Sequence, residues 1–531
     1  MWPRFSQATT DIFCASNFIC SEARALNAIS LENRLMTFSR TSLSFLVAWL
    51  LLLGGCATRQ VNPPIAKYDT HSLRQFQRQW QRGAQQYLVI LAFSGGGTRA
   101  AAFSYGVLEE LRQIEIVTKD GRRTRLLDQV DVITGISGGS FTALAYGLYG
   151  EKLFDSYEAR FLKRNVQGEI TSRTLNPLNW GKLSSTGWGR SELAAQLYDE
   201  ILFNGATFAD LYRAGGPAIA VSATELSTGS RIVFVPQNFD VMCADLGPIR
   251  LSRAAAASSA VPVVLSPITI NNYGGSCGYE QPPWLRAFAE LSEPPRPAAR
   301  ALNRLQELQQ LDNGVEDPYF HLVDGGISDN LGLRSVLDVL ETYEALHEAG
   351  LPTPLDHIRH IIIFVVNSLS IPSTKWNKSE NPPGTIDVLI KSAGVPIDRY
   401  SGEMVEQLKD IDARWSALRR IRDSAAFAKD KDPAMTRIVN APNADISVID
   451  VSFKALQDKS ERDYLNQLPT SFVLPSEAVD RLRAAARTLI LNSPDLQQAI
   501  RDAGANMVER PATGTTVSAA VTTPTAATEA K

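Results

Sequence analysis

Histidine is scarce in this sequence, which leaves few candidates for a histidine base in a catalytic site. The 531 residues include five histidines: His71, His321, His347, His357 and His360. None stands in a setting typical of the base of a catalytic triad, and we interpret all five as structural. Neither a long run of basic residues nor an internal repeat of solenoid period is present.

Charge of one sign is also not in excess. The chain has 53 Lys and Arg against 56 Asp and Glu, a formal net charge of −3. With no basic run, nucleic acid is not an expected partner. A hydrophobic content of 44% over this length is enough for a sizeable core, in one large domain or two to three ordinary ones.

The apolar run 43–53 is shorter than the roughly 20 residues that a bilayer-spanning helix needs. It follows the basic Arg40 and ends in small residues, an order typical of an export signal rather than of a buried core helix. Leu53-Gly54-Gly55-Cys56 resembles the lipobox of bacterial lipoproteins. The resemblance implies cleavage before Cys56 and attachment of lipid to it, which would anchor the domain to a membrane. Ala57, where the inner-membrane retention signal of that family has Asp, implies the outer membrane of a bacterial cell envelope.

The domain organisation follows from composition. Residues 1–35 form no credible start of a signal peptide, so we hypothesise that translation begins at Met36. The predicted parts are a leader at 1–35, a signal peptide at 36–55, a tether at 56–85, a core at 86–375 that carries the motifs described below, a mainly helical extension packed on the core at 376–510 and a disordered tail at 511–531.

Cysteine usage agrees with export. Cys14 and Cys20 fall in the leader and Cys56 is the predicted lipid site, which leaves Cys243 and Cys277. An even pair in an exported protein predicts a disulfide. Two buried free thiols are the alternative, since the sequence does not show whether the two Cα atoms are close enough.

Apolar patterning alternates between strands and helices. Buried strands are predicted at 87–93, 130–134, 218–222, 232–235, 361–366 and, as an edge strand, 446–451. Helical spacing of apolar residues follows the first two, over 103–114 and 141–148, and a last helix is predicted over 479–489. The alternation predicts an α/β fold with a largely parallel central sheet. A helical stripe at 404–418 indicates a helix packed on the core, with an amphipathic membrane-contact helix as the alternative.

Gly135-Ile136-Ser137-Gly138-Gly139 lies between a predicted strand and a predicted helix. A G-x-S-x-G in this context is typical of a nucleophile elbow, in which Ser137 projects over the positive end of the following helix. An ordinary strand-to-helix turn with Ser137 as N-cap is the alternative.

The glycine loop Gly95-Gly96-Gly97 follows the strand 87–93 and precedes Arg99. Its backbone N–H groups could hold the oxyanion of an acyl-transfer reaction, and Arg99 could orient the loop or face an anionic head group. A rival interpretation is equally compatible with the loop itself: Gly95-x-Gly97-x-x-Ala100 fits the dinucleotide-binding fingerprint, with Asp120 at about the expected offset.

Asp324 ends an apolar run and precedes Gly325 and Gly326. A carboxylate at a strand end in an open loop could serve as the base for a serine nucleophile. A DGG sequence is also frequent in ordinary turns, so its weight comes from the two other motifs.

In their order, GGGTR, GISGG and DGG resemble the motifs of the patatin-like phospholipases, and the block 254–262 resembles the Ala/Ser-rich block of that family. The resemblance covers about 87–370, with Ala100 where many members have Gly. It implies a three-layer α/β/α fold and a Ser137–Asp324 dyad that hydrolyses acyl esters of membrane lipids. The glycine loop would form the oxyanion hole, and no metal or organic cofactor is needed. A histidine-based α/β-hydrolase, a dinucleotide-binding oxidoreductase and a non-catalytic envelope lipoprotein remain the alternatives.

Overall fold

The computed structural model describes residues 58–80, 86–118, 121–185, 187–282, 286, 299–353, 355–370, 376–429 and 435–509. The predicted start at Met36, the signal peptide 36–55, Cys56, Asp120 and the tail 511–531 lie outside these residues. Within the described ranges, no helix combines the length and apolarity that crossing a membrane requires.

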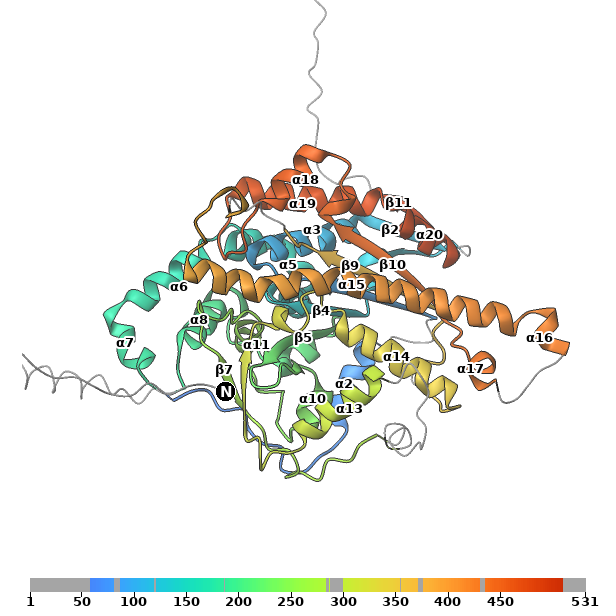
Figure 1. Cartoon of the computed structure of the whole chain (residues 1–531), viewed down its shortest axis with the longest axis horizontal. Helices are drawn as coiled ribbons and strands as arrows, with labels where there is room; N and C mark the ends of the chain where they lie inside the picture. The colour runs from blue at the N-terminus through green and yellow to red at the C-terminus, as the bar shows by residue number, and fades with distance from the viewer. Residues whose placement is uncertain are drawn as a thin grey trace, which may run out of the picture. The chain divides into compact units, whose positions relative to one another are not determined.

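A largely parallel sheet forms the centre of the fold (Figure 1). Strand β1 lies between β4 and β9, with both pairs parallel, and β5 and β10 extend the parallel part on either side. Strands β6, β7 and β8 add antiparallel pairs beyond β5. The strands of this sheet are β1 (Tyr87–Phe93), β4 (Val132–Ile136), β5 (Ala218–Glu225), β6 (Arg231–Val233), β7 (Ile268–Asn271), β8 (Tyr319–Val323), β9 (His360–Asn367) and β10 (Asp445–Ser452).

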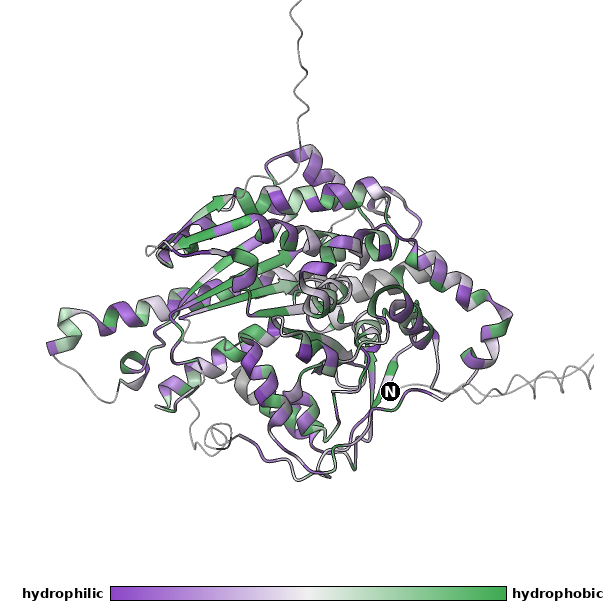
Figure 2. Cartoon of the chain, turned by 180° about the vertical axis from the view of Figure 1, so that it is seen from behind, coloured by the Kyte–Doolittle hydropathy of each residue, from purple (hydrophilic) through white to green (hydrophobic). Residues whose placement is uncertain are grey.

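Both faces of the sheet are covered, which explains the continuous apolar runs of its inner strands. In β1, Val89, Leu91 and Phe93 point into one core, and the alternate residues point into the other. Helices α3 (Gly97–Gln113), α4 (Gly138–Tyr149) and α19 (Ser476–Leu491) line the first core. Helices α14 (Arg334–Glu348) and α15 (Thr385–Arg422) line the second (Figures 1 and 2). The predicted three-layer α/β/α class is confirmed.

Further helices surround these layers. They are α2 (His71–Trp80), α5 (Leu153–Tyr157), α6 (Val166–Leu175), α7 (Pro177–Leu183), α8 (Arg190–Tyr198), α9 (Phe208–Ala214), α10 (Pro236–Val241), α11 (Leu251–Ser258), α13 (Ala299–Leu311), α16 (Ala425–Lys429), α17 (Thr436–Val439), α18 (Lys459–Asn466) and α20 (Pro494–Asp502).

The segment after residue 376 contributes to both sheets as well as to the helical layers. Strand β10 is the edge of the central sheet, in the range where an edge strand was expected. Strand β11 (Ala505–Glu509) pairs with β2 (Ile114–Thr118), which also pairs with β3 (Arg123–Arg125). These two pairs form a separate antiparallel sheet.

The apolar stripe predicted at 404–418 packs inward, so the membrane-contact alternative is wrong for it. Met404, Leu408, Ile411 and Trp415 are buried in the second core. The Trp415 indole donates to Glu344 Oε2 over 2.8 Å, which ties α15 to α14.

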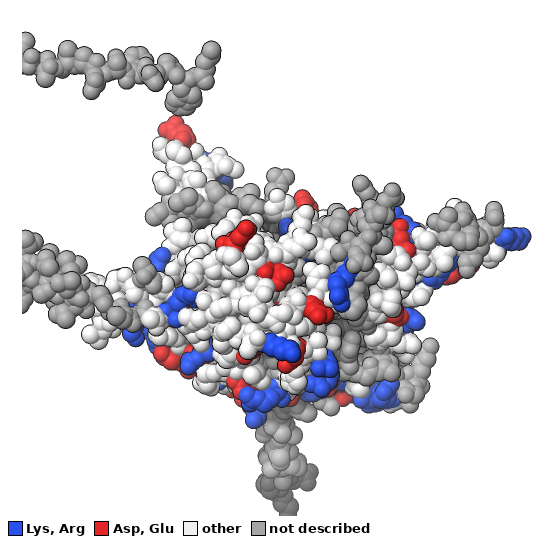
Figure 3. Space-filling view, turned by 90° about the horizontal axis from the view of Figure 1, so that it is seen from below, with Lys and Arg blue, Asp and Glu red and all other residues white. Residues whose placement is uncertain are grey.

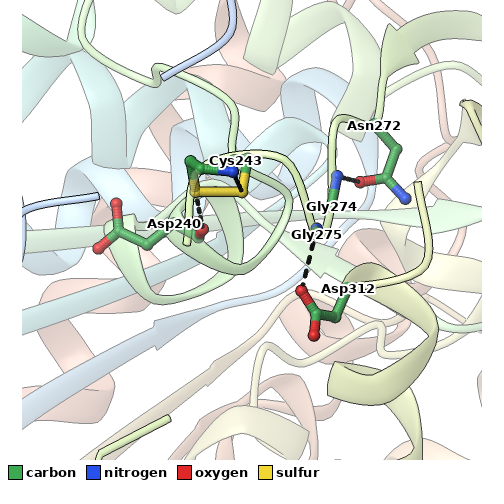
Figure 4. Close-up of a disulfide and its surroundings, with 7 residues drawn as sticks. Asp240, Cys243, Asn272, Gly274, Gly275 and Asp312 are labelled. Atoms are coloured by element: carbon green, nitrogen blue, oxygen red, sulfur yellow. Dashed lines mark hydrogen bonds between the residues drawn. A yellow bond between two sulfur atoms is a disulfide. The ribbon is translucent and has the colours of Figure 1, made fainter. Parts of the chain in front are cut away.

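The predicted tether is ordered over the part that the structure describes. The Asp245 N–H donates to Pro63 O and the Ile65 N–H donates to Cys243 O. The Tyr68 N–H donates to Cys277 O over 3.0 Å. Cys243 and Cys277 form a disulfide with a Cα–Cα distance of 5.5 Å, the first of the two alternatives left open by the sequence (Figure 4). The polar composition predicts a solvated chain here, but the backbone groups of this segment are instead bonded to the loops that the disulfide joins.

Acidic and basic side chains are interspersed on the face of the molecule shown in Figure 3. This mixture matches the near-neutral net charge of the sequence and differs from the single-sign surface typical of nucleic-acid binding.

Loss of the disulfide is expected to destabilise the fold. It closes a loop between residues 34 apart in sequence, and loop-closure entropy predicts a contribution of about 3–4 kcal/mol. The variant Cys243→Ser/Cys277→Ser should therefore unfold at lower urea concentration than the oxidised wild type. Reduced wild type is the matched control and should resemble the variant; equal midpoints in all three would contradict the expectation.

Candidate active site

Ser137 occupies the sharp turn between β4 and α4. Its φ of 47° and ψ of −118° are unusual for a residue with a side chain, and such a conformation costs on the order of 1–3 kcal/mol. The surroundings hold it in place: its N–H donates to Ser258 Oγ over 2.9 Å, and its C=O accepts from the Ser140 hydroxyl over 2.6 Å. This is the geometry of a nucleophile elbow rather than of an N-cap, because the side chain accepts no capping hydrogen bond.

The glycines beside Ser137 permit a close approach to the glycine loop. A Cβ on Gly138 would lie 2.0 Å from Gly97 O, and a Cβ on Gly139 would lie 2.7 Å from Phe93 O. Any side chain at either position would push the elbow away from the end of β1 and from the loop. The two motifs therefore meet by backbone contact, which the sequence alone could not show.

Asp324 is brought directly to Ser137. The Ser137 hydroxyl donates to Asp324 Oδ2 over 2.9 Å, and the Gly326 N–H donates to Asp324 Oδ1 over 2.8 Å. The backbone is fixed as well, because the Asp324 N–H donates to Ala260 O and the Thr224 hydroxyl donates to Asp324 O. Both members of the predicted dyad are buried, with Ser137 5% and Asp324 7% exposed.

Burial raises the pKa of Asp324 to about 6, although the hydrogen bonds from the Gly326 N–H and the Ser137 hydroxyl act in the opposite direction. A carboxylate with a pKa near 6 is a stronger base than an exposed one and is still ionised at neutral pH. The arrangement can thus draw a proton from Ser137 without a histidine.

The structure gives His321 and His347 partners away from Ser137. The Ser137 hydroxyl bonds to Asp324, not to an imidazole. His321 Nδ1 pairs with the Thr269 hydroxyl over 3.0 Å, and His347 pairs with Asp356. This geometry does not support a histidine-based triad at Ser137.

The three glycines of the loop differ in what their N–H groups can do. The Gly95 N–H donates to Asn330 O over 2.9 Å, so the expectation that it forms part of an oxyanion hole is wrong for this conformation. Gly96 and Gly97 have positive φ values of 140° and 60°, and their N–H groups have no partner among the residues that the structure describes. Their amides are the available donors.

Arg99 is buried, and this favours the loop-orienting role over contact with a head group. Its guanidinium donates to Ser368 O over 2.7 Å, to Leu468 O over 2.8 Å and to the Thr470 hydroxyl over 3.1 Å. These bonds tie the start of α3 to the chain after β9 and to the loop before α19. Because the guanidinium of Arg99 is fully engaged in these bonds, it positions the glycine loop and does not face the substrate.

Two residues without a predicted role also shape the site. Ser258 lies in the Ala/Ser-rich block 254–262 and accepts a hydrogen bond from the Ser137 N–H. The sequence showed this block but did not indicate what its serines bind. Asn330 accepts the Gly95 N–H with its backbone, and a Cβ on Gly95 would lie 2.5 Å from Asn330 Oδ1 and 3.4 Å from Ser137 Cβ. Its amide side chain therefore lies beside the dyad.

The dinucleotide interpretation fails on topology. It requires the second strand of a βαβ unit to lie parallel beside the first. The strand that follows α3 is β2, which belongs to the separate antiparallel sheet, whereas β1 lies between β4 and β9. Asp120 is outside the described residues. Among the described residues, no group of three or more His, Cys, Asp or Glu side chains is arranged to hold a metal ion.

Fold and site together define an α/β protein with a serine nucleophile elbow. Residues 91–337 match the family model described as Patatin-like phospholipase. The match identifies this part of the chain as a patatin-like phospholipase domain, and it contains the glycine loop, Ser137 and Asp324.

Individual relatives are more distant. A "cGAMP-activated phospholipase" of Escherichia coli (strain TW11681) is 29% identical over 188 residues, which cover 34% of this chain and 47% of that protein. The chain thus spans about half the length of this curated relative. Human GIVD cytosolic phospholipase A2 shares 12% identity at a TM-score of 0.35, covering 85% of this chain and 69% of its own. VipD from Legionella pneumophila shares 10% identity at a TM-score of 0.28, and the match covers 80% of this chain and 68% of VipD. Scores this low carry no weight for function.

Activity is expected to depend on the ionisation of Asp324. Because its pKa lies at about 6 and the carboxylate is the form that accepts a proton, kcat/KM for an ester should rise with pH through an apparent pKa near 6 and then level. The measurement is a pH–rate profile of hydrolysis, with Asp324→Asn as the inactive control. Full activity retained at pH 4 would contradict this assignment.

The variant Ser258→Ala should impair the elbow, because it leaves the buried Ser137 N–H without its acceptor. We expect a loss of about 1–3 kcal/mol in stability or a roughly tenfold or larger loss of kcat as the turn shifts. Ser259→Ala is the matched control, since the Ser259 hydroxyl bonds to Ala255 O within its own helix turn. Similar behaviour of the two variants, in thermal unfolding and in turnover, would argue against a specific role of Ser258.

Proposed function

We propose that the chain is a serine hydrolase of lipid acyl esters that works with a Ser137–Asp324 dyad. The observation that carries the proposal is the 2.9 Å hydrogen bond from the Ser137 hydroxyl to a buried Asp324 carboxylate. Membership of residues 91–337 in the patatin-like phospholipase family supports a lipid substrate.

The proposed reaction has two stages. In the first, Asp324 accepts the proton of Ser137 while Ser137 Oγ attacks the ester carbonyl. The tetrahedral intermediate then collapses, the alcohol leaves with the proton from Asp324, and the acyl group stays on Ser137. In the second, Asp324 takes a proton from water, the hydroxide attacks the acyl-enzyme, and a fatty acid is released as the proton returns to Ser137.

The negative charge of each tetrahedral intermediate needs nearby donors. We assign this role to the N–H groups of Gly96 and Gly97, since Gly95 donates to Asn330 O instead. One such donor typically stabilises the transition state by about 2.7–4 kcal/mol. Arg99 supports this hole indirectly through its bonds to Ser368 and Leu468.

We also propose that lipid on Cys56 anchors the domain to the bacterial cell envelope, at its outer membrane. The support is the lipobox-like Leu53–Cys56 after an apolar signal. Incorporation of labelled fatty acid into the wild type but not into Cys56→Ser would agree with this, and equal labelling of the two would overturn it.

The dyad can be tested directly. Ser137→Ala should lower ester turnover at least about a thousandfold, because the nucleophile is lost, and should abolish labelling by a fluorophosphonate probe. His321→Ala, a histidine close to Asp324 in sequence but bonded elsewhere, should retain both. Undiminished turnover by Ser137→Ala would reject the proposal, and loss of activity in His321→Ala would favour a histidine-based enzyme.

A further inference from the structure

Large apolar side chains are exposed together on the hairpin formed by α6 and α7. Leu175 and Leu178 are 67% and 87% exposed, and Trp180 is 45% exposed. Helix α7 has no buried residue, and it projects beside α6 away from the central sheet (Figure 1). Isolated exposed leucines are common, but a cluster at the tip of a projecting element indicates a contact surface. We call residues 175–180 the apolar hairpin.

The charges around the apolar hairpin favour a lipid surface. The stretch 175–190 carries two basic residues, Lys182 and Arg190, and no Asp or Glu. It also carries the exposed Trp180, and tryptophan is the side chain most typical of the membrane–water interface. Apolar and aromatic groups flanked by cations match the layered chemistry of a bilayer with anionic head groups.

A hydrogen bond connects this region to the candidate active site. Arg190, at the start of α8, donates from Nη2 to Val263 O over 3.0 Å. Val263 and Val264 are each 55% exposed, and Val263 has a φ of 73°, which is strained for a β-branched residue. Three residues earlier in the chain, Ala260 O accepts the Asp324 N–H. The exposed valines thus lie on the loop that leads directly from the dyad.

The described chain nearest in sequence to the predicted lipid site packs in the same region. Arg59 packs against the loop between α7 and α8, because a Cβ on Gly187 would lie 3.4 Å from Arg59 Cδ. Arg59 also donates to Thr269 O on the edge strand β7. Cys56 precedes Arg59 by three residues, and three residues span at most about 11 Å. Lipid on Cys56 would therefore enter the membrane close to this loop.

We propose that the apolar hairpin together with the loop 261–264 is a membrane-docking face, and that its partner is a phospholipid bilayer containing anionic lipid. Docking there would bring the bilayer to the loop beside Asp324, so that lipids reach Ser137 from the surface on which the protein sits. The inference rests on the proposed lipid substrate. A bilayer is also the partner that lipid on Cys56, as proposed above, would require near this face.

The first test compares two substrates for the full chain. The variant Leu175→Ser/Leu178→Ser should hydrolyse lipid in vesicles of phosphatidylethanolamine and phosphatidylglycerol at least about tenfold more slowly than wild type at limiting lipid, because two apolar groups no longer enter the bilayer. Its turnover of a soluble short-chain nitrophenyl ester should be unchanged. Val339→Ser on α14, where the side chain is 52% exposed, is the matched control and should behave as wild type on both. Wild-type rates of the double variant on vesicles would overturn the proposal.

A second measurement does not depend on activity. In the full chain carrying Ser137→Ala, hydrogen exchange of peptides over 175–180 and 261–266 should slow when the same vesicles are added. No protection in these peptides would overturn the docking face. Protection that appears without vesicles as protein concentration rises would assign the face to self-association instead. If the wild type cleaved neither substrate, the proposed function would fail while hydrogen exchange still decided the docking face.

Discussion

The backbone contact between the elbow and the glycine loop is the constraint on which the site depends. Gly138 lies so close to Gly97 that no side chain fits between them, and Gly139 has no room for a side chain beside the end of β1. Because β1 and β4 are parallel neighbours, their carboxyl ends place both turns at one edge of the sheet. The strained Ser137 backbone is tolerated there because packing and hydrogen bonds fix it from several sides.

The chemistry of the dyad then follows from burial. A carboxylate in solvent would be a weak base toward a serine hydroxyl, whereas removal from water raises the pKa of Asp324, and its carboxylate accepts the hydrogen bond of the Ser137 hydroxyl. The Gly326 N–H holds the carboxylate through Asp324 Oδ1, and the Thr224 hydroxyl holds the backbone through Asp324 O. The scarcity of histidine in the sequence and the geometry of the site are therefore consistent with each other.

Local patterns predicted the local structure. The apolar runs of β1 and β9 and the glycine-flanked Ser137 could be recognised because strand burial and turn chemistry leave a mark within a few residues. Contacts between residues far apart in the sequence could not be recognised from local patterns. The Gly95 N–H is used by Asn330, Arg99 reaches Leu468, and β2 pairs with β11 from the end of the chain. The same limit explains why the polar composition predicts a tether at 56–85, since the partners of Pro63, Ile65 and Tyr68 lie near residues 243 and 277.

The pairing of that segment with the disulfide loops has a consequence for reach. While Cys243 and Cys277 are joined, Ile65 and Tyr68 are bonded to the backbone of the two cysteines, so the chain is paired with the rest of the fold within about ten residues of Cys56. If reduction released the segment 58–70, the distance that the chain can span between Cys56 and the folded domain would increase by as much as about 45 Å. With lipid on Cys56, as proposed above, the redox state of the compartment would then set how far the catalytic domain can lie from the membrane.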